Sequence, residues 1–390
     1  MNINLEQVRA DTPGCERVVH FNNAGAALPT RVVVDTVVAH LEREAEIGGY
    51  EAAEEAAGRI EAVYASVALL VGCAADEIAL VESATRAWTA WFAALRFAPG
   101  DRILTHRVEY ASNFLPMLQA AREYGVSVEV VPSAAAGEID VDALAATVDE
   151  RVRFVALTHV PSQGGLVNPA AAVGAVTRAA GVPFVLDACQ STGQLPLAVD
   201  ELGCDVLVAT GRKYLRGPRG TGFLYVRRGY LEGLEPFAPD LRGAEWTDAD
   251  TYTLRPDARR FEQWERSIAG VLGLGAAVDY ARDLGLDAIW ARVRGLAETL
   301  RAALVELPLV TLRDEGTEQC GIVTFTVDGE SPTAVKRRLR SAGVNVWTID
   351  ASTARLDLDA RGVAEVVRAS VHYYNTEDEV GRLARALRPA

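Results

Sequence analysis

The sequence predicts an α/β protein with a mostly parallel, seven-stranded sheet in a large domain and a smaller α+β domain at the C-terminal end. Short, continuous apolar runs recur along the first 230 residues, and longer amphipathic segments separate them. After Tyr230 the composition shifts toward Pro, Asp, Arg and aromatic residues. Continuous apolar strands that alternate with helices are typical of a parallel sheet covered by helices on both faces.

The expected elements of the large domain follow from these patterns. Strands buried on both faces are apolar at every position, whereas covering helices are apolar at every third or fourth position. The expected strands are residues 78–81, 102–105, 126–131, 154–157, 184–187, 206–209 and 222–226. The expected helices are residues 32–48, 53–71, 114–124 and 170–180, with another from the Ser83-Ala84-Thr85 turn to Leu95.

The C-terminal part predicts a second unit. Residues 236–262 are expected to connect the two units and to face the substrate. A helix over 267–284 ends at Gly285, and Asp287 is the expected N-cap of a helix that ends at Leu307. The remaining expected elements are strands 321–327, 344–347 and 366–370, and helices 331–343 and 376–387. We expect a large domain over 15–250 and a small domain that combines 1–14 with 251–390.

Composition excludes several classes of function. The 390 residues carry a net charge of −14 without a basic run, so nucleic acid and anionic membranes are poor partners. No apolar stretch is long enough to span a membrane, and the N-terminus lacks the pattern of a secretory signal. The five cysteines form no C-x-x-C pair, which argues against zinc and against a disulfide framework. These features predict a cytoplasmic enzyme without a metal.

Lysine is almost absent from the chain. Only Lys213 and Lys336 occur among the 39 basic residues, and Lys213 lies in the glycine-rich turn Gly211-Arg212-Lys213-Tyr214. A guanidinium stays protonated, whereas an ε-amine can lose its proton and condense with an aldehyde. A lysine kept at this place therefore suggests that its amine reacts.

Polar residues gather where the expected strands end. Asp187 ends one strand, Lys213 follows the next, and Ser83-Ala84-Thr85 joins a strand to a helix. An amine and a carboxylate at one sheet edge suit pyridoxal phosphate, because the amine binds the aldehyde and the carboxylate keeps the pyridine nitrogen protonated. The amides of the turn suit the phosphate. Taken singly, each has a structural alternative: a turn-forming aspartate, a solvated lysine and a helix N-cap.

The same segments resemble the class V aminotransferase family, which includes cysteine desulfurases, isopenicillin N epimerase and C–S lyases. The resemblance lies in Leu186-Asp187-Ala188-Cys189-Gln190, Thr210-Gly211-Arg212-Lys213 and Gly217-Pro218-Arg219-Gly220-Thr221-Gly222. Phe21-Asn22-Asn23-Ala24-Gly25 and Val367-Arg368-Ala369-Ser370 extend it over nearly the whole chain. The resemblance implies fold-type I architecture, covalent pyridoxal phosphate and a homodimer with sites near the subunit boundary.

The resemblance also implies roles for individual residues. Lys213 would carry the cofactor and move protons, Asp187 would pair with the pyridine nitrogen, and Gln190 would contact the phenolic oxygen. Arg368 would bind the substrate α-carboxylate, which suits a planar guanidinium. The further candidates are Ser83, Ala84, Thr85, Tyr110, His159, Ser162 and Arg212 for the cofactor, and Asn23, Gly25 and Tyr50 for the substrate.

The chain departs from the family pattern at several positions. Desulfurases carry a nucleophilic cysteine ahead of the Arg-Ala-Ser segment, but residues 347–355 contain none, so persulfide formation by that route is not expected. The cofactor-stacking histidine becomes Ala111, unless Tyr110 fills its place. Arg212 replaces a histidine that often precedes the lysine, and is expected to serve the phosphate. The usual asparagine is replaced around Ser162.

Three features keep two interpretations each. His159 is either a neighbour of the cofactor or a structural residue at a strand end. Cys189 occupies a small-residue position, which favours a buried, inert thiol over a catalytic one. Trp246, Tyr252 and Trp264 either shape a substrate pocket or pack in the interior.

Removal of the α-proton can lead to racemisation, transamination or β-elimination. The missing desulfurase cysteine favours β-elimination, and residues 44–53 and 159–169 are similar to C–S lyases of small-molecule biosynthesis. We therefore expect a C–S lyase that converts a cysteine conjugate to a thiol, pyruvate and ammonia. The alternatives are a class V aminotransferase or an amino-acid epimerase, and a protein of this fold that binds without catalysis.

Overall fold

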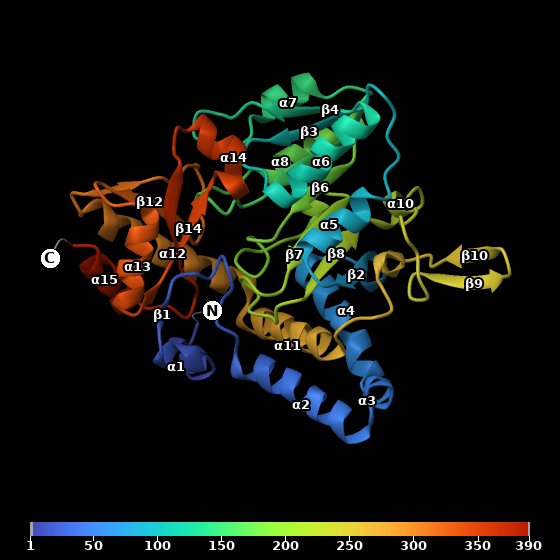
Figure 1. Ribbon diagram of the computed structural model, residues 1–390, viewed down its shortest axis with the longest axis horizontal. Helices are drawn as coiled ribbons and strands as arrows, with labels where there is room; N and C mark the ends of the chain where they lie inside the picture. The colour runs from blue at the N-terminus through green and yellow to red at the C-terminus, as the bar shows by residue number, and fades with distance from the viewer. Residues whose placement is uncertain (1–2, 389–390) are drawn as a thin grey trace.

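A seven-stranded sheet with the order β2-β8-β7-β6-β5-β3-β4 forms the centre of the molecule (Figure 1). The computed structural model describes residues 3–388. Only β8 runs against its neighbours, so the sheet is mostly parallel, as predicted. The strands are β2 (Ile78–Val81), β3 (Arg102–His106), β4 (Ser127–Val131), β5 (Val152–Thr158), β6 (Phe184–Asp187), β7 (Val206–Thr210) and β8 (Gly222–Val226).

Helices cover both faces of this sheet. Neighbouring strand residues belong to different apolar clusters: Ile103 packs with Trp88 and Trp91, whereas Leu104 belongs to a cluster with Val63 and other residues of the opposite face. The first face is covered by α5 (Ala84–Phe92) and α6 (Ala111–Tyr124), and the second by α4 (Ala57–Val71), α8 (Ala170–Ala180) and α11 (Ile268–Leu284). This double burial explains why the strands are apolar at successive positions.

Helices outside the sheet layers complete the first part of the chain. The helix predicted over 53–71 is in fact two helices, because Gly48 starts the first and the chain turns at Ala56. Long helix α2 packs against α11. These elements are α1 (Leu5–Ala10), α2 (Arg31–Ile47), α3 (Gly49–Glu55), α7 (Val141–Thr147), α9 (Val199–Leu202) and α10 (Arg228–Leu231).

A four-stranded antiparallel sheet lies beside the large sheet and confirms the smaller α+β unit (Figure 1). Its order is β11-β12-β15-β14, and the short strand β13 pairs instead with β1 near the N-terminus. The strands are β1 (Val19–His20), β11 (Val310–Leu312), β12 (Ile322–Val327), β13 (Val344–Asn345), β14 (Trp347–Asp350) and β15 (Glu365–Ser370). The helices are α12 (Leu286–Val305), α13 (Pro332–Ser341), α14 (Ala351–Ala360) and α15 (Glu377–Ala386).

Two expectations for this region were wrong. Asp287 is not the N-cap of α12; Gly285 occupies that position with φ +84°, and Asp287 lies in the first turn. The strand expected over 344–347 is divided between β13 and β14, which pair with different partners. The first difference arises because the local bond from the amide of Ile289 to the carbonyl of Gly285 starts α12 earlier than expected. The second arises because pairing with residues far apart in sequence decides where each strand begins.

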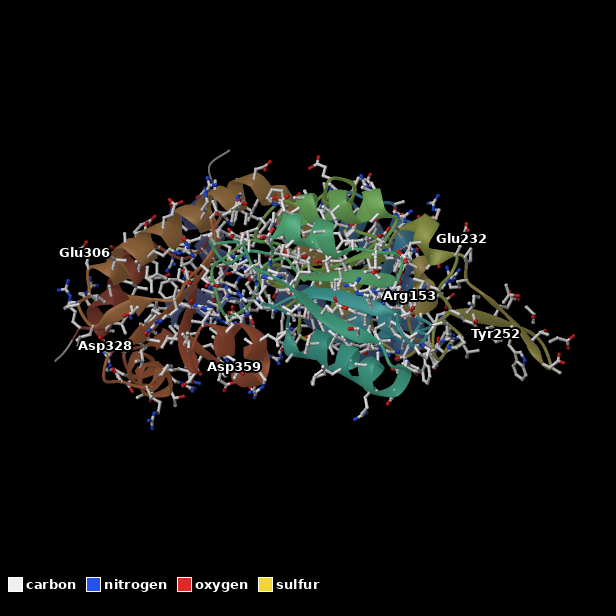
Figure 2. All side chains as sticks on the ribbon, turned by 90° about the horizontal axis from the view of Figure 1, so that it is seen from above. Arg153, Glu232, Tyr252, Glu306, Asp328 and Asp359 are labelled. Atoms are coloured by element: carbon white, nitrogen blue, oxygen red, sulfur yellow. The ribbon has the colours of Figure 1, made fainter. Side chains whose placement is uncertain are left out.

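The segment between the two sheets forms an exposed hairpin of β9 (Ala244–Asp248) and β10 (Thr251–Leu254). It projects from the body of the molecule, and Tyr252 lies on it (Figure 2). Trp246, Tyr252 and Trp264 are 73%, 49% and 55% exposed, so in this chain they neither pack in the interior nor line the pocket described below. Within residues 3–388, no helix is both long and apolar enough to cross a bilayer.

Candidate active site

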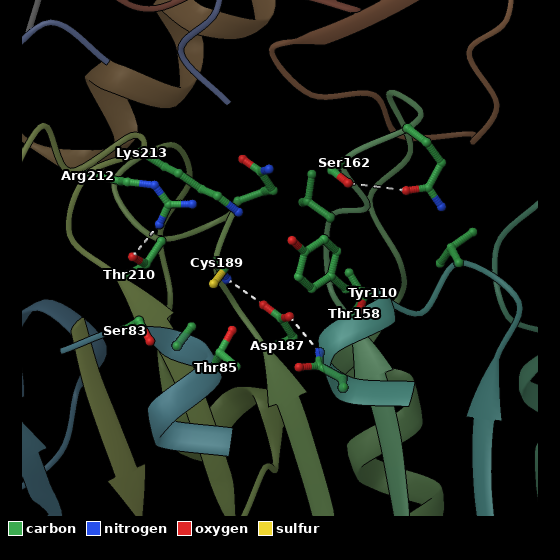
Figure 3. Close-up of a pocket in the computed structure, with 16 residues that line it drawn as sticks. Ser83, Thr85, Tyr110, Thr158, Ser162, Asp187, Cys189, Thr210, Arg212 and Lys213 are labelled. Atoms are coloured by element: carbon green, nitrogen blue, oxygen red, sulfur yellow. Dashed lines mark hydrogen bonds between the residues drawn. The ribbon is translucent and has the colours of Figure 1, made fainter. Parts of the chain in front are cut away.

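A pocket lies at the carboxyl ends of β5, β6 and β7, the sheet edge predicted to carry the polar residues (Figure 3). The sequence candidates that line it are Ser83, Ala84, Thr85, Tyr110, Ser162, Asp187, Gln190, Arg212 and Lys213. The lining also includes Asn113, Thr158, Gln163 and Thr210, which were not selected from the sequence. Those four come from different elements, so no local motif could have grouped them.

One corner of the pocket suits an anion. The N-terminus of α5 opens there, and Ser83 caps the helix by accepting a 3.1 Å hydrogen bond from the amide of Arg86. Arg212 lies in the same corner and donates to Thr210 Oγ1 at 2.9 Å. Unpaired amides at a helix start together with a guanidinium are a favourable environment for phosphate. Gly222 lets β8 approach this turn, since a Cβ on it would lie 3.1 Å from the Ser83 carbonyl carbon.

Asp187 is held at the end of β6 by two donors. Its Oδ1 accepts a 2.9 Å bond from the amide of Cys189, and its Oδ2 accepts a 2.8 Å bond from Asn113 Nδ2. The carboxyl group is buried, and the strand pairing sets Asp187 beside Thr158 of β5 and Val208 of β7. The plane of the carboxylate is therefore fixed while it faces the pocket (Figure 3).

Lys213 follows β7 in a closed loop. The amide of Gly217 donates to the carbonyl of Gly211 at 2.8 Å, and that of Arg216 to the carbonyl of Lys213 at 2.9 Å. Among the described residues, the Lys213 amine has neither a hydrogen-bond nor an ion-pair partner. Burial lowers the pKa of Lys213 below its ordinary value of 10.5, against the opposing effect of Asp187. A lowered pKa favours the neutral, nucleophilic form of the amine.

Arg368 is a buried cation at the side of this pocket. It lies on β15, donates to Asn22 Oδ1 at 3.2 Å and to the carbonyl of Ser162 at 3.3 Å, and leaves its buried Nε without a partner. Burial lowers the pKa of Arg368 to about 10, so the side chain is still charged at neutral pH. Within residues 3–388 it has no carboxylate partner, which is unusual for a buried guanidinium and suits an anionic ligand.

Several of the predicted site residues lie outside the pocket or make structural contacts. Asn23 donates to the carbonyls of Ser370 and His20 and accepts from Tyr374, so its side chain is committed to structure rather than to a substrate. Tyr50 is 78% exposed on α3 and is not part of this pocket in its own chain. The neighbouring Asn22, not Asn23, contacts Arg368.

Gly25 acts indirectly, because a Cβ there would lie 2.6 Å from Asn22 Oδ1. His159 lies between the lining residues Thr158 and Val160 but does not line the cavity itself. Its Nδ1 is buried without a partner, and burial lowers its pKa to about 4. This placement favours the structural interpretation of His159.

Cys189 borders the pocket but is a poor nucleophile. Burial, with the Asp187 charge beside it, raises the pKa of the thiol to about 12. A thiol needs its thiolate form to attack, so Cys189 stays unreactive near neutral pH. This agrees with the inert thiol expected from the sequence. The segment that would carry the desulfurase cysteine forms strand β14 and helix α14 instead.

Comparison with known proteins adds to this geometry. A model of the aminotransferase class-V family matches residues 18–383. The chain belongs to the class V aminotransferase family. A cysteine desulfurase of Yersinia pestis is 31% identical over 404 aligned residues, covering 99% of this chain and 98% of the relative. A probable cysteine desulfurase of Methanothermobacter thermautotrophicus is 30% identical, with 98% and 97% of the two chains covered.

Solved structures agree with this class V aminotransferase assignment. The apo structure of a cysteine desulfurase from Thermococcus onnurineus NA1 has a TM-score of 0.91 at 27% identity, covering 99% of this chain and 98% of that one. The cystine C–S lyase C-DES, in complex with its reaction product cysteine persulfide, has a TM-score of 0.88 at 25% identity, covering 97% of this chain and 100% of that one. These neighbours confirm the predicted fold type.

Pyridoxal phosphate is the cofactor of this family, as the sequence predicted. The pocket fits that group on three structural observations. It holds a lysine amine without a partner, an anion-binding helix start beside Arg212, and a buried carboxylate at the next strand end. Gln190 adds a buried Oε1 without a hydrogen-bond partner.

Proposed function

We propose that this enzyme is a C–S lyase that cleaves an S-substituted cysteine to a thiol, pyruvate and ammonia in small-molecule biosynthesis. One observation carries the proposal. The pocket joins Lys213, Asp187 and the α5 helix start, while residues 347–355, where desulfurases carry their nucleophile, contain no cysteine. The enzyme would thus share the α-carbon chemistry of its desulfurase relatives but lack their sulfur acceptor.

The chain's residues divide the binding of the cofactor among them. Lys213 would hold the aldehyde carbon, and Asp187 the ring nitrogen. Thr85, the Ala84 amide and Arg212 would hold the phosphate, with Ser83 capping the helix behind it. Gln190 lines the pocket, and its amide nitrogen, which donates to the carbonyl of Ala24 at 3.1 Å, is the group that could donate to the phenolic oxygen of the ring. When bound, the cofactor withdraws electrons from the substrate α-carbon.

Arg368 would orient the substrate by binding its α-carboxylate. Among the described residues, the buried Nε of Arg368 has no acceptor, and the carboxylate would supply one. Once the substrate amine has replaced it at the aldehyde carbon, the freed Lys213 Nζ would take the proton from the α-carbon, a role that needs a neutral amine and so fits its lowered pKa. As the Cβ–S bond breaks, its electron pair stays on sulfur. The thiolate takes a proton from Lys213, and water releases the three-carbon product as pyruvate and ammonia.

Sulfur would leave as a free thiol because no thiolate is available to accept it. Cys189 is the cysteine that lines the pocket among the described residues, and its pKa is raised to about 12. The likeness to a solved cystine C–S lyase supports cleavage of a C–S bond on this fold.

Product analysis tests the reaction. S-alkyl cysteines and alanine are offered separately to the cofactor-loaded protein in deuterated water. Thiol, pyruvate and ammonia in equal amounts from S-alkyl cysteines support the lyase. Deuterium in recovered alanine without net loss would indicate an epimerase, and conversion of the cofactor to its amine form an aminotransferase. A persulfide on Cys189 with free cysteine as substrate would indicate a desulfurase.

Because the chain has only two lysines, the lysine that carries the cofactor can be assigned directly. Borohydride reduction and peptide mass spectrometry should find the reduced cofactor on Lys213 and not on Lys336. Lys213→Ala should lose both the adduct and product formation, while Lys336→Ala keeps them. An adduct on Lys336, or none, would support the alternative of a protein that binds without catalysis.

We also propose a homodimer. Val34, Val38 and Leu41 are 44%, 44% and 50% exposed on one face of α2, whose other face packs on α11. Apolar stripes of this kind mark protein interfaces. Tyr50 on the adjoining α3 would then face the partner rather than its own pocket. Light scattering after Val38→Asp should show monomers; a monomeric wild-type protein would overturn the proposal.

The domain division at residue 250, within the β9–β10 turn, and the cytoplasmic location stay predictions.

A further inference from the structure

A single amide nitrogen joins two buried carboxyl groups beneath the pocket. Asn113 Nδ2 donates to Asp187 Oδ2 at 2.8 Å and to Glu109 Oε1 at 2.9 Å. Asn113 is 3% exposed and lies in the first turn of α6. Figure 3 shows the bond that reaches Asp187 from this helix. Each hydrogen of the amide thus has its own acceptor.

Glu109 lies deeper than Asp187 and is surrounded by donors. Its Oε1 also accepts from Thr158 Oγ1 at 2.7 Å and from the amide of Tyr110 at 3.0 Å, and its Oε2 accepts from Thr105 Oγ1 at 3.0 Å. Burial, together with the nearby Asp187 charge, raises the pKa of Glu109. The group is 4% exposed and does not line the pocket, so it has no direct access to a substrate.

This arrangement fixes the orientation of the Asn113 side chain. If the amide were rotated by half a turn, its oxygen would face two carboxyl oxygens; Asp187 Oδ2 would lose this donor, and Glu109 Oε1 would keep only those from Thr158 and Tyr110. Glu109 therefore keeps the nitrogen of Asn113 pointed at Asp187. With Cys189 N–H on Oδ1 and Asn113 on Oδ2, neither oxygen of Asp187 can rotate away from the pocket.

We propose that Asn113, held by Glu109, is a positioning residue that aims Asp187 at the pyridine nitrogen and keeps that nitrogen protonated. The inference rests on the proposed role of Asp187 as the partner of this nitrogen. A carboxylate oxygen that accepts one hydrogen bond retains a lone pair for a second. Without the Asn113 donor, Asp187 would gain rotational freedom, which would weaken the second bond and with it the proton affinity of the ring.

The test measures the protonation of the pyridine nitrogen directly. Protein is loaded with pyridoxal phosphate carrying ¹⁵N in the ring, and the nitrogen chemical shift is followed with pH to find the midpoint of ring deprotonation. The charge of Asp187 affects the pKa of Glu109, Cys189 and Lys213, and none of these three residues is changed in the variants. Asn113→Ala removes the donor. Asn113→Leu keeps a similar size and removes the donor without adding a charge.

We expect the midpoint to fall by about one pH unit or more in both variants, the size of one hydrogen bond to a charged group. Gln119→Ala is the matched control, because this amide on the same helix bonds only the exposed Glu123, and it should leave the midpoint unchanged. Melting of the cofactor-free proteins checks that each variant folds. Asn113→Leu, which fills the space of the side chain, protects the test if Asn113→Ala does not fold.

An unchanged midpoint in Asn113→Leu, with a lower midpoint in Asp187→Asn, would overturn this inference and leave the proposed function intact. A midpoint that Asp187→Asn also fails to move would overturn both, because Asp187 would then not be the partner of the ring nitrogen.

Discussion

The guanidinium of Arg368 donates a 3.2 Å hydrogen bond to the side-chain oxygen of Asn22. A second donor of Arg368 contacts the carbonyl of Ser162. Three segments far apart in sequence thus meet at one buried cation. Asn22 and Ser162 are neutral acceptors, so they orient the guanidinium without cancelling its charge, which stays available for a carboxylate.

Arg368→Lys should reduce kcat/KM for an S-alkyl cysteine by about 100-fold, because lysine keeps the charge but loses the planar fork that binds a carboxylate at two points. That loss corresponds to about 3 kcal/mol. Steady-state kinetics measure it, and the cofactor adduct on Lys213 should persist. Arg355→Lys is the control, since the Arg355 side chain is 70% exposed. Wild-type kinetics in Arg368→Lys would contradict the proposed carboxylate site.

Gly25→Ala should disturb the Arg368 site through Asn22. The new Cβ would lie 2.6 Å from Asn22 Oδ1, which forces Asn22 away from Arg368. We expect a higher KM and a loss of about 1–3 kcal/mol in the free energy of unfolding. Denaturant melts and kinetics measure the two effects. Gly58→Ala, on the exposed side of α4 with open space around it, should not destabilise the protein. Equal behaviour of both variants would argue against crowding at Asn22.

Stability should fall in acid partly through His159. Its pKa is lowered by burial from 6.5 to about 4, so the unfolded chain binds a proton more readily than the folded one between these values. The free energy of unfolding should therefore decrease as the pH falls from 6.5 to 4, by about 3 kcal/mol for this group. His159→Asn should show a shallower decrease, while His106 and His372, whose pKa values burial also lowers, keep part of it. Identical slopes in wild type and variant would show that His159 is not buried as a neutral ring.

Asp357 should stabilise helix α14 against the large sheet. It is 1% exposed, and its carboxyl oxygens lie 3.2 Å from Arg107 Nε and 3.1 Å from Arg361 Nη1. Asp357→Ala would leave partly buried guanidinium groups without this partner, which should cost about 3 kcal/mol of unfolding free energy. Asp359→Ala removes a side chain that is 61% exposed on the same helix and should change stability by less than about 1 kcal/mol. Similar losses in the two variants would indicate that helix propensity, not the ion pairs, is responsible.

Local patterns predicted most of the large sheet. Strands such as β6 and β8 have the predicted bounds, because each is apolar throughout and ends at a polar or turn-forming residue. The strand boundaries that failed depend on remote partners. Whether 344–347 forms one strand or two depends on β1 and β15, and neither is near it in the chain. The helix over 53–71 divides where the chain turns at Ala56, which carries no breaking signal.

The sequence by itself determined the fold class and the family, and it predicted Lys213, Asp187 and the Ser83–Thr85 turn as site residues because each lies at or just after the end of an apolar strand. Only the tertiary structure decided the neighbours of these residues. In the structure Asn22, not Asn23, contacts Arg368, and Tyr50 does not line the pocket of its own chain. Asn113 donates hydrogen bonds to both Glu109 and Asp187. The reason is physical: spacing along one element sets which residues share a face, but hydrogen bonds between elements depend on packing in three dimensions.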